Sequence, residues 1–401
     1  MRRRLPVRKQ VNTRTEYPLT RWSTSPVIIG IGVGLLAGPL GLKLIDPQLA
    51  EDGALIQSMS EAVLLICLFC AGLRLRAPLE WAPWRVPLQL ASLTTVSAVL
   101  LSSAAAYLIF GMTLLQSLLL AVVLAPTDAA LAADAHASGD GDQELVPFAL
   151  AAEGAVTSAM VAPVVMLVLA RMGATGMGPV LLGSLTLTVS WSLLGGAAVG
   201  WLIGLAASRW LALIDRDRQG DLLEEMIVFA AGALAYVCAL ALRSDALLAA
   251  LAAGLALSHG GRRRMTRKQP LGARVLRFAG RAERGATVLV MVLLGTLLGA
   301  ADFTLRTVLY AVVLLILVRP LAVRLGFGRP VVTPAQRRML ELFAARGPAA
   351  LYCLALVASH DLPPTFGREL ENAVLVVIVV SIISGAASAL TARKPSPGAA
   401  L

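Results

Sequence analysis

The stretch Ala373-Val-Leu-Val-Val-Ile-Val-Val-Ser-Ile-Ile383 is apolar except for Ser381. A helix on the surface of a soluble protein needs polar residues on one face, and this stretch offers no such face. Similar apolar runs recur along the chain, separated by short charged connections. Runs of about 20 residues are long enough to cross a hydrocarbon core of about 30 Å. The sequence therefore predicts a helical membrane protein.

The composition supports this prediction. Apolar residues make up 57% of the 401 residues, charged residues make up 15%, and the mean hydropathy is +0.77. A soluble domain of this size carries about a quarter charged residues. We therefore expect an all-α polytopic membrane protein, with little of its surface in water.

We predict twelve transmembrane helices from the apolar runs. The predicted ranges are 26–42, 59–75, 86–110, 114–133, 145–170, 179–206, 223–241, 244–258, 286–301, 304–323, 337–358 and 371–391. They form one transmembrane domain over 26–392, between a basic N-terminal tail (1–25) and a short C-terminal tail (393–401). An even number of spans places both termini on the same side of the membrane.

Lys and Arg in the connections predict the orientation, because they accumulate on the cytoplasmic side. With both termini in the cytoplasm, the basic N-terminal tail and the basic connection 259–284 lie on that side. The predicted outer connections then carry few positive charges: Lys43, Arg171, Arg243, Arg306 and Arg368. The net charge of +11 thus reflects the orientation of the chain in the membrane and contact with anionic lipids. We expect the protein in the cell (inner) membrane, and we expect no nucleic-acid partner.

Four charged residues fall inside predicted spans: Asp128, Glu153, Arg319 and Arg346. Charges at membrane depth are costly and commonly mark an ion or substrate pathway. Three of the same spans contain proline beside or near the charge, at Pro126, Arg319-Pro320 and Gly347-Pro348. Proline disrupts the helical hydrogen-bond ladder, and secondary transporters use broken helices to expose backbone groups to an ion. We predict helix breaks at all three positions and a transport site near them.

Enzyme and metal chemistry find little support in the sequence. All three histidines lie in predicted connections: His136, His259 and His360. We find no nucleophile–base pair, no phosphate loop and no set of metal ligands. We therefore expect no catalytic residues, no metal site and no cofactor.

Five motifs in order resemble the sodium/proton antiporters of the monovalent cation:proton antiporter-1 superfamily. The most specific is Ala125–Asp134, which reads APTDAALAAD and is similar to the family's APTDPVLASD. Phe148–Glu153, which reads FALAAE, follows at the expected distance. The other three matching stretches are Leu68–Leu75, Arg319–Val323 and Phe343–Ala355. The resemblance runs from about Pro18 to Ala392 and has no counterpart of the extra apolar span with which many relatives begin.

The resemblance implies a fold and a mechanism. It implies inverted repeats, with broken crossing helices in a core domain, a separate dimerisation domain, and a homodimer. The segment with Thr127 and Asp128 would unwind and cross a second broken helix. A carboxylate would bind a monovalent cation or a proton, but not both, and movement of the core domain would carry it across the membrane. Glu153 would pair with Arg319 as a structural ion pair.

The sequence departs from the family where the Asn-Asp pair of the ion site would stand. Those positions carry Thr157 and Ser158. A hydroxyl can contribute an oxygen ligand but no negative charge near neutral pH. Asp128 and Glu153 would then balance the two core arginines, and pairing of both acids would leave no carboxylate for a cation.

Three functions remain open. The first is exchange of a monovalent cation, sodium foremost, for protons, with Asp128 or Glu153 in the role of the lost aspartate. The second is a degenerate homologue with a binding or regulatory role and no exchange. The third is transport of a different substrate through Thr157, Ser158 and the positive ends of broken helices.

Overall fold

The computed structural model is all-helical. It describes residues 25–128, 145–174, 182–213, 221–260, 273–327, 332–342, 345–360 and 362–392. In chain order, the α-helices and the short π (η1, η5) and 3-10 (η4) segments are α1 (Ser25–Ala37), α2 (Leu49–Arg74), α3 (Trp81–Gln89), η1 (Leu90–Thr94), α4 (Thr95–Phe110), α5 (Leu114–Val123), α7 (Leu145–Met172), α8 (Leu182–Leu213), α9 (Asp221–Ala241), α10 (Ala246–Gly260), α11 (Ala273–Leu297), η4 (Leu298–Ala300), α12 (Leu305–Val313), η5 (Leu314–Val318), α13 (Arg319–Gly326), α14 (Pro334–Leu342), α15 (Pro348–Ala358) and α16 (Pro364–Ala392).

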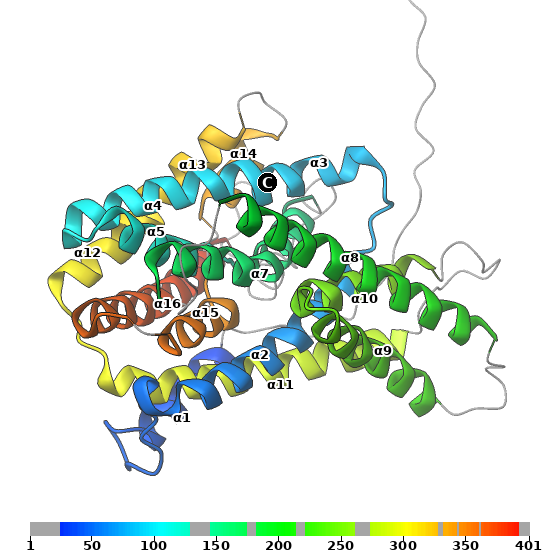
Figure 1. Ribbon diagram of the computed structural model, residues 1–401, viewed down its shortest axis with the longest axis horizontal. Coiled ribbons are helices and arrows are strands. Elements are labelled where there is room, and N and C mark those ends of the chain that lie inside the picture. The colour runs from blue at the N-terminus through cyan, green and yellow to red at the C-terminus, as the bar shows by residue number, and fades with distance from the viewer. Residues whose placement is uncertain are drawn as a thin grey trace, which may run out of the picture.

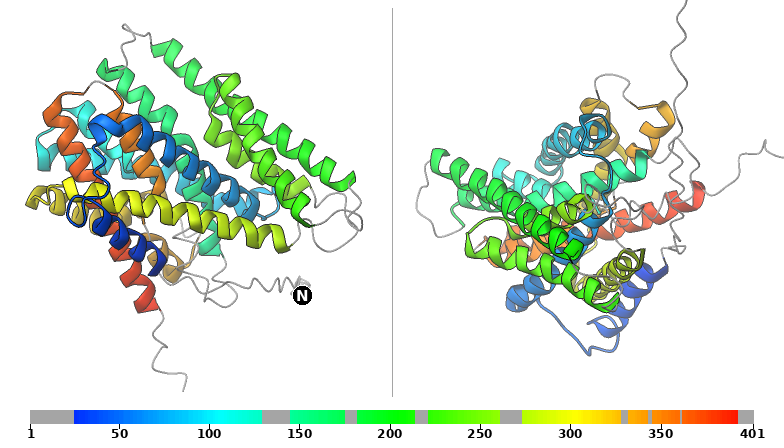
Figure 2. Two further views of the ribbon diagram at one scale, coloured as in Figure 1. Left: turned by 90° about the horizontal axis from the view of Figure 1, so that it is seen from below. Right: turned by 90° about the vertical axis from the view of Figure 1, so that its right-hand side faces the viewer.

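The helices form an elongated bundle, with most of them running along its length (Figures 1 and 2). In Figure 1, α1, α2 and α11 lie along the lower side, while α3, α4 and α13 lie along the upper side. Between these layers are α5, α7, α15 and α16, and α8, α9 and α10 extend toward one end. Helix α10 packs against both α8 and α2 and so joins this end to the rest of the bundle.

The prediction of a helical membrane protein is confirmed. Within the described ranges, six helical segments are long and apolar enough to cross a membrane: Glu51–Arg74, Trp81–Phe110, Leu145–Met172, Leu187–Leu213, Leu223–Ala241 and Leu305–Gly326. Four shorter apolar helices accompany them: Pro26–Ala37, Leu114–Val123, Ala246–Gly260 and Pro348–Ala358. Short apolar helices of this kind are found where spans are interrupted. Both predicted tails lie outside the described residues, except for Ser25.

The predicted span 337–358 is two helices, α14 and α15. Its Gly347-Pro348 pair explains the interruption: Gly347 has a non-helical backbone (φ −155°, ψ −126°), and Pro348 begins α15. Proline fits the first turn of a helix, where its missing N–H has no intrahelical partner anyway. The sequence prediction of a break at this position is correct.

The predicted break at Arg319-Pro320 is wrong. Helix α12, the π-helical turn η5 and α13 run on without interruption from Leu305 to Gly326. A π turn widens the helix by one residue, and such turns commonly occur at functional positions. Proline removes one N–H and crowds the preceding turn, and we attribute the π turn at Leu314–Val318 to this strain.

Two helices begin earlier than the apolar runs suggest. Helix α2 begins at Leu49 and α11 begins at Ala273, whereas the predicted spans begin at 59 and 286. In α11 the added turns are amphipathic, with buried Val275 and Ala279 on the face that continues to Val290. Amphipathic turns beyond the apolar run are missed by a count of consecutive apolar residues.

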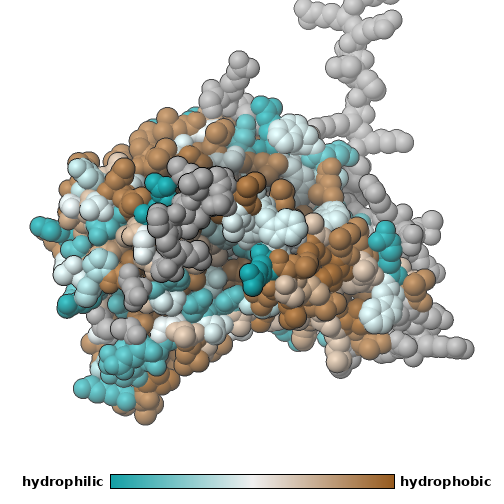
Figure 3. All heavy atoms as spheres, viewed as in Figure 1, coloured by the Kyte–Doolittle hydropathy of each residue, from teal (hydrophilic) through white to brown (hydrophobic). Residues whose placement is uncertain are grey.

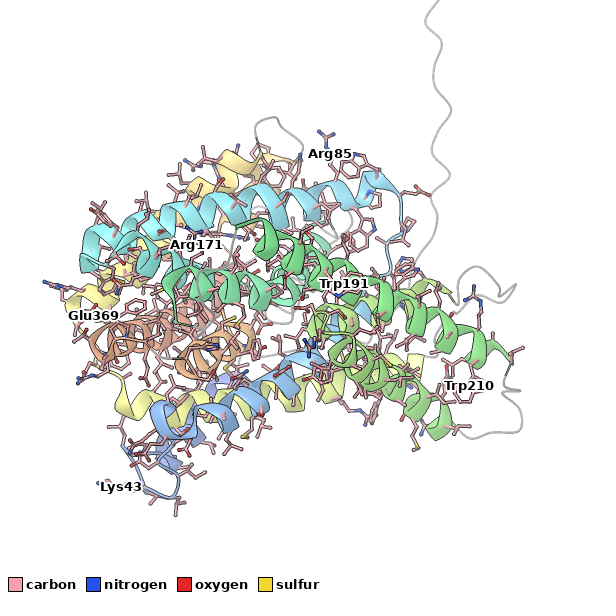
Figure 4. The ribbon with its side chains drawn as sticks, viewed as in Figure 1. Lys43, Arg85, Arg171, Trp191, Trp210 and Glu369 are labelled. Atoms are coloured by element: carbon pink, nitrogen blue, oxygen red, sulfur yellow. The ribbon has the colours of Figure 1, made fainter. Side chains whose placement is uncertain are left out.

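Apolar side chains cover much of the outer surface, as Figure 3 shows for one face. On α8, Leu187, Leu194 and Leu202 are each more than 60% exposed. An apolar surface of this extent would be unstable in water but is stable against lipid chains. Figure 4 places Trp210 near one end of the molecule and Lys43 and Glu369 near the other, as expected for residues at two membrane–water boundaries.

Candidate functional site

Two non-helical segments, 124–128 and 345–347, are hydrogen-bonded to each other inside the bundle, and we call the place where they meet the crossing. Helix α5 ends at Val123. Leu124 is a turn residue, and residues 125–128 have no helical structure. The second segment, Ala345–Gly347, precedes α15. The backbone N–H of Asp128 donates to the carbonyl oxygen of Ala345 at 2.8 Å, and Arg346 Nε donates to the carbonyl oxygen of Leu124 at 2.6 Å. The segments therefore hold each other in place.

The sequence explains why both segments stay non-helical. Pro126 supplies no backbone N–H for a helical hydrogen bond. In the second segment, Gly347 and Pro348 interrupt the helical structure between α14 and α15. Backbone groups released from the helices then bond to side chains. Ser158 Oγ donates to the carbonyl oxygen of Thr127 at 3.3 Å, and the N–H of Arg346 donates to Ser381 Oγ at 3.0 Å.

Asp128 lines a small cavity beside this crossing, of about 30 Å³. A space of this size holds about one water molecule or a small ion. The residues that line it come from α2, α7, α11, α15 and the crossing: Leu64, Cys67, Leu68, Ala71, Asp128, Gly154, Ala155, Ser158, Glu283, Gly347, Pro348 and Ala349. We call it the acidic cavity, because Asp128 and Glu283 are the charged residues among these lining residues.

Gly347 makes room for the Asp128 carboxylate. A Cβ atom at position 347 would lie 2.5 Å from Asp128 Oδ2 and 3.3 Å from the Met291 methyl carbon. The first distance is below any normal contact. Glycine at this position therefore allows the carboxylate to approach the second broken helix.

The two hydroxyls at the altered family motif have different surroundings. Ser158 is buried and lines the acidic cavity. Thr157 Oγ1 donates back to the carbonyl oxygen of Glu153 at 2.9 Å, within the same helix, and it lines neither this cavity nor the second one described below. Of the pair, Ser158 is the one that lines the acidic cavity.

Glu153 and Arg319 form a bidentate ion pair. Arg319 Nη1 donates to Glu153 Oε1 at 2.6 Å, and Arg319 Nη2 donates to Glu153 Oε2 at 2.8 Å. Both side chains are at least 95% buried, and Arg319 Nε also donates to the carbonyl oxygen of Leu340. Opening such a pair would leave two charges without compensation in a medium of low dielectric constant. The geometry fits a structural role and gives Glu153 no place in the acidic cavity.

A second cavity, of about 20 Å³, is lined by residues of α4, α5, η5, α13 and the crossing, among them Thr127, Arg319 and Arg346. Thr127 lines this second cavity, whereas the neighbouring Asp128 lines the acidic cavity. Thr127 is 7% exposed, and its Oγ1 has no hydrogen-bond partner among the described residues. The crossing thus separates a cavity with two carboxylates from one with two guanidinium groups.

Glu283 is the residue that the sequence analysis missed. It lies in the amphipathic first half of α11 and is 3% exposed. It forms an ion pair with Arg74, at the last turn of α2. The positions of Val275, Ala279 and Glu283, four residues apart, mark one buried helix face, and this periodicity is the signal that could have identified it. The balance of Asp128 and Glu153 against two core arginines therefore leaves out a further buried acid, Glu283, and its partner Arg74.

Comparison with known proteins gives a family and a fold. Residues 15–392 match the family model "Sodium/hydrogen exchanger, transmembrane". The chain is similar in structure to the sodium proton antiporter MjNhaP1 from Methanocaldococcus jannaschii at pH 8, with a TM-score of 0.71 and 18% identity over 90% of this chain and 92% of that one. A second structure of MjNhaP1, an electron-microscopy map, gives a TM-score of 0.70 and 18% identity over 92% of each chain. The comparison with curated proteins gives no match.

Proposed function

Since the chain belongs to the sodium/hydrogen exchanger family of membrane transporters, we propose that it exchanges a monovalent cation, sodium foremost, for protons. The observation that carries this proposal is the Asp128 carboxylate in the acidic cavity, at the crossing of two broken helices. Carboxylates at membrane depth beside interrupted helices bind ions in secondary transporters. The protein is not an enzyme.

The proposed exchange depends on one carboxylate that binds either ligand. A cation and a proton neutralise the same negative charge, so that binding of one displaces the other. Ser158 Oγ would add an oxygen ligand, as would a backbone carbonyl of the crossing, such as that of Thr127, which already accepts from Ser158. The Thr157 hydroxyl donates to backbone carbonyl oxygens within α7, and we give that residue no direct role.

We propose that Thr157 and Ser158 stand where other family members have Asn-Asp, and that Asp128 takes the role of the missing aspartate. Glu153 cannot take it, because its two oxygens are both bonded to Arg319. Arg346 contributes by holding the crossing together through Leu124. The Glu153–Arg319 pair holds α7 against α13.

We further propose the arrangement that accompanies this function in the family. The domain at residues 26–392 would comprise twelve spans as inverted repeats, with a core domain that moves against a dimerisation domain in a homodimer. Both termini would lie in the cytoplasm, as the distribution of Lys and Arg indicates. The apolar face of α8, with Leu187, Leu194 and Leu202 exposed, would meet lipid or the second protomer.

Proton flux in liposomes tests the exchange. Purified protein is reconstituted with an internal pH dye, and external sodium, potassium and lithium are stepped in turn. We expect cation-driven flux in the wild type, and at least a tenfold loss in Asp128→Asn. Asp302→Asn, at an exposed connection, is the matched control and should keep wild-type flux.

Two results would contradict the proposal. Silence of the folded wild type with all three cations would favour a degenerate homologue with a binding or regulatory role. Thermal stabilisation by a substrate that is not a cation, together with absent cation flux, would favour transport of a different substrate.

A further inference from the structure

Glu283 has no assigned role in the exchange proposed above, although it lines the same cavity as Asp128 and Ser158. We infer that Glu283 is the second cation-binding carboxylate of this transporter, and that Arg74 is its internal counter-cation. This inference rests on the proposed function. Glu283 would bind the cation from α11, in the cavity that Ser158 of the altered motif lines from α7.

Glu283 shares the acidic cavity with Ser158. Residues of α7, including Ser158, and of α11, including Glu283, line this cavity. With serine at position 158, α7 contributes a hydroxyl and no charge. Glu283 brings a carboxylate to the same space from another helix. A cation in the cavity would then meet oxygen ligands from Asp128, Ser158 and Glu283, and hard monovalent cations prefer such ligands.

The ion pairs of Glu153 and Glu283 differ in how far their arginines are exposed. The Glu153–Arg319 pair is buried at both ends, and it is therefore a fixed structural contact. The Glu283 side chain is 4% exposed, while that of its partner Arg74 is 37% exposed. Water can therefore solvate the Arg74 guanidinium when it leaves Glu283, whereas Arg319 has no such access. Since the Glu283 carboxylate is buried and lines the cavity, a cation bound there can replace Arg74 as its counter-charge.

Glu283 also adds charge to the cavity. Asp128 and Glu283 together bring two carboxylates to its lining. Like charges that share a small space disfavour each other's charged form, and a bound cation or proton relieves this repulsion.

Cation-dependent thermal stabilisation of the purified, full-length protein tests the role of Glu283 without requiring transport. Sodium, potassium and lithium chloride are titrated at constant ionic strength, and the half-saturating concentration is read from the shift in apparent Tm. We expect Glu283→Gln to raise this concentration at least tenfold. We expect Arg74→Gln to lower the half-saturating concentration, because the Glu283 carboxylate then loses Arg74 as its counter-charge and attracts the cation more strongly.

Glu225→Gln is the matched control. Glu225 is also buried at its carboxylate and paired with an exposed arginine, Arg274, at 3.2 Å, but it does not line the acidic cavity. Its half-saturating cation concentration should equal that of the wild type. If Glu283→Gln fails to fold, two other variants replace it. Arg74→Gln should have a lower half-saturating concentration than the wild type, and Glu283→Asp, which keeps the carboxylate, should have a concentration close to that of the wild type.

The outcomes separate the two proposals. A half-saturating concentration in Glu283→Gln within twofold of the wild type overturns the role of Glu283, even if the wild type transports cations. Equal shifts in Glu283→Gln and Glu225→Gln overturn it as well. Loss of cation stabilisation in Glu283→Gln alone supports it, even if the wild type shows no flux and the exchange function fails.

Discussion

The backbone N–H of Asp128 donates to the carbonyl oxygen of Ala345 at 2.8 Å, although 217 positions separate the two residues in the sequence. This hydrogen bond joins the two non-helical segments directly. Since an unpaired backbone group is costly at membrane depth, each segment needs the other to stay non-helical. The position of the Asp128 carboxylate in the acidic cavity is thus fixed by the backbone of a second broken helix.

Gly347→Ala should abolish cation binding and flux. Its Cβ atom would lie 2.5 Å from Asp128 Oδ2 and would force the carboxylate or the crossing to move. We expect at least a tenfold loss of cation-driven proton flux with modest loss of stability. Gly53→Ala in α2 is the control, because no atom lies within 4 Å of its added Cβ, and alanine favours a helix by up to about 1 kcal/mol. Normal flux in Gly347→Ala would show that this close approach has no role in transport.

Glu153→Gln should destabilise the fold. Removing one member of a buried ion pair costs about 3–5 kcal/mol, because the remaining charge stays buried. A marked decrease in apparent Tm in detergent is the expected result. Glu341→Gln serves as a comparison, since its partners Arg324 and Arg337 are 63% and 35% exposed and each pair with an exposed arginine contributes about 0–1 kcal/mol. Equal Tm values for the two variants would contradict a structural role for the Glu153–Arg319 pair.

Ser158→Asp should strengthen cation binding. It adds a carboxylate to a cavity that Asp128 and Glu283 already line, so that an empty site becomes more repulsive and a filled one more favourable. We expect the half-saturating sodium concentration to fall about tenfold, which corresponds to about 1.4 kcal/mol. Thr157→Val should leave it unchanged, because that hydroxyl is bonded within α7. A reversed order of effects would assign the ion contact to Thr157.

Asp245 should make stability depend on pH. It lies in the connection between α9 and α10, and its carboxylate accepts a hydrogen bond from the N–H of Leu248 at 2.6 Å. Burial above all, with a smaller effect of the nearby Glu61, raises the pKa of the Asp245 carboxyl from 3.8 to about 6, against the lowering effect of the hydrogen bonds from the backbone. The folded state therefore binds more protons than the unfolded state between about pH 4 and 6, and stability from this group increases as pH falls through that window.

Asp245→Asn tests this pH dependence. Asparagine keeps an acceptor oxygen for the first turn of α10 and removes the buried charge. We expect a higher apparent Tm than in the wild type at pH 8 and a flatter pH profile between pH 6 and 4. Asp302→Asn, at an exposed position, should retain the wild-type profile. An unchanged profile in Asp245→Asn would assign the pH dependence to other groups.

Much of the architecture could be predicted from the sequence, because lipid imposes long apolar helices and makes every interruption conspicuous. The breaks near Pro126 and at Gly347-Pro348 were predictable for this reason. At Arg319-Pro320 the same rule failed: a π turn accommodates the proline within a continuous helix. Proline shows where the hydrogen-bond ladder must change, but not whether the change is a break or a local widening.

The candidate site was predicted in part. Asp128 and Ser158 could be found because both lie in apolar surroundings within a recognisable motif. Glu283 could not be found by the same search, since it follows Arg277 and Arg281 in turns that resemble a charged connection. Only the packing of α11 against α2 brings its carboxylate to the cavity. The helical periodicity of α11 marks Glu283 as part of a buried face, but it does not show which helix packs against that face.

Accumulation of radioactive sodium in proteoliposomes under an imposed proton gradient, acid inside, tests the central claim most directly. Exchange predicts that wild-type protein accumulates sodium above its external concentration while the gradient lasts, and that Asp128→Asn accumulates none. Collapse of the proton gradient with an ionophore should release the accumulated sodium. Wild-type protein that is folded, binds sodium and yet shows no accumulation would contradict exchange as its function.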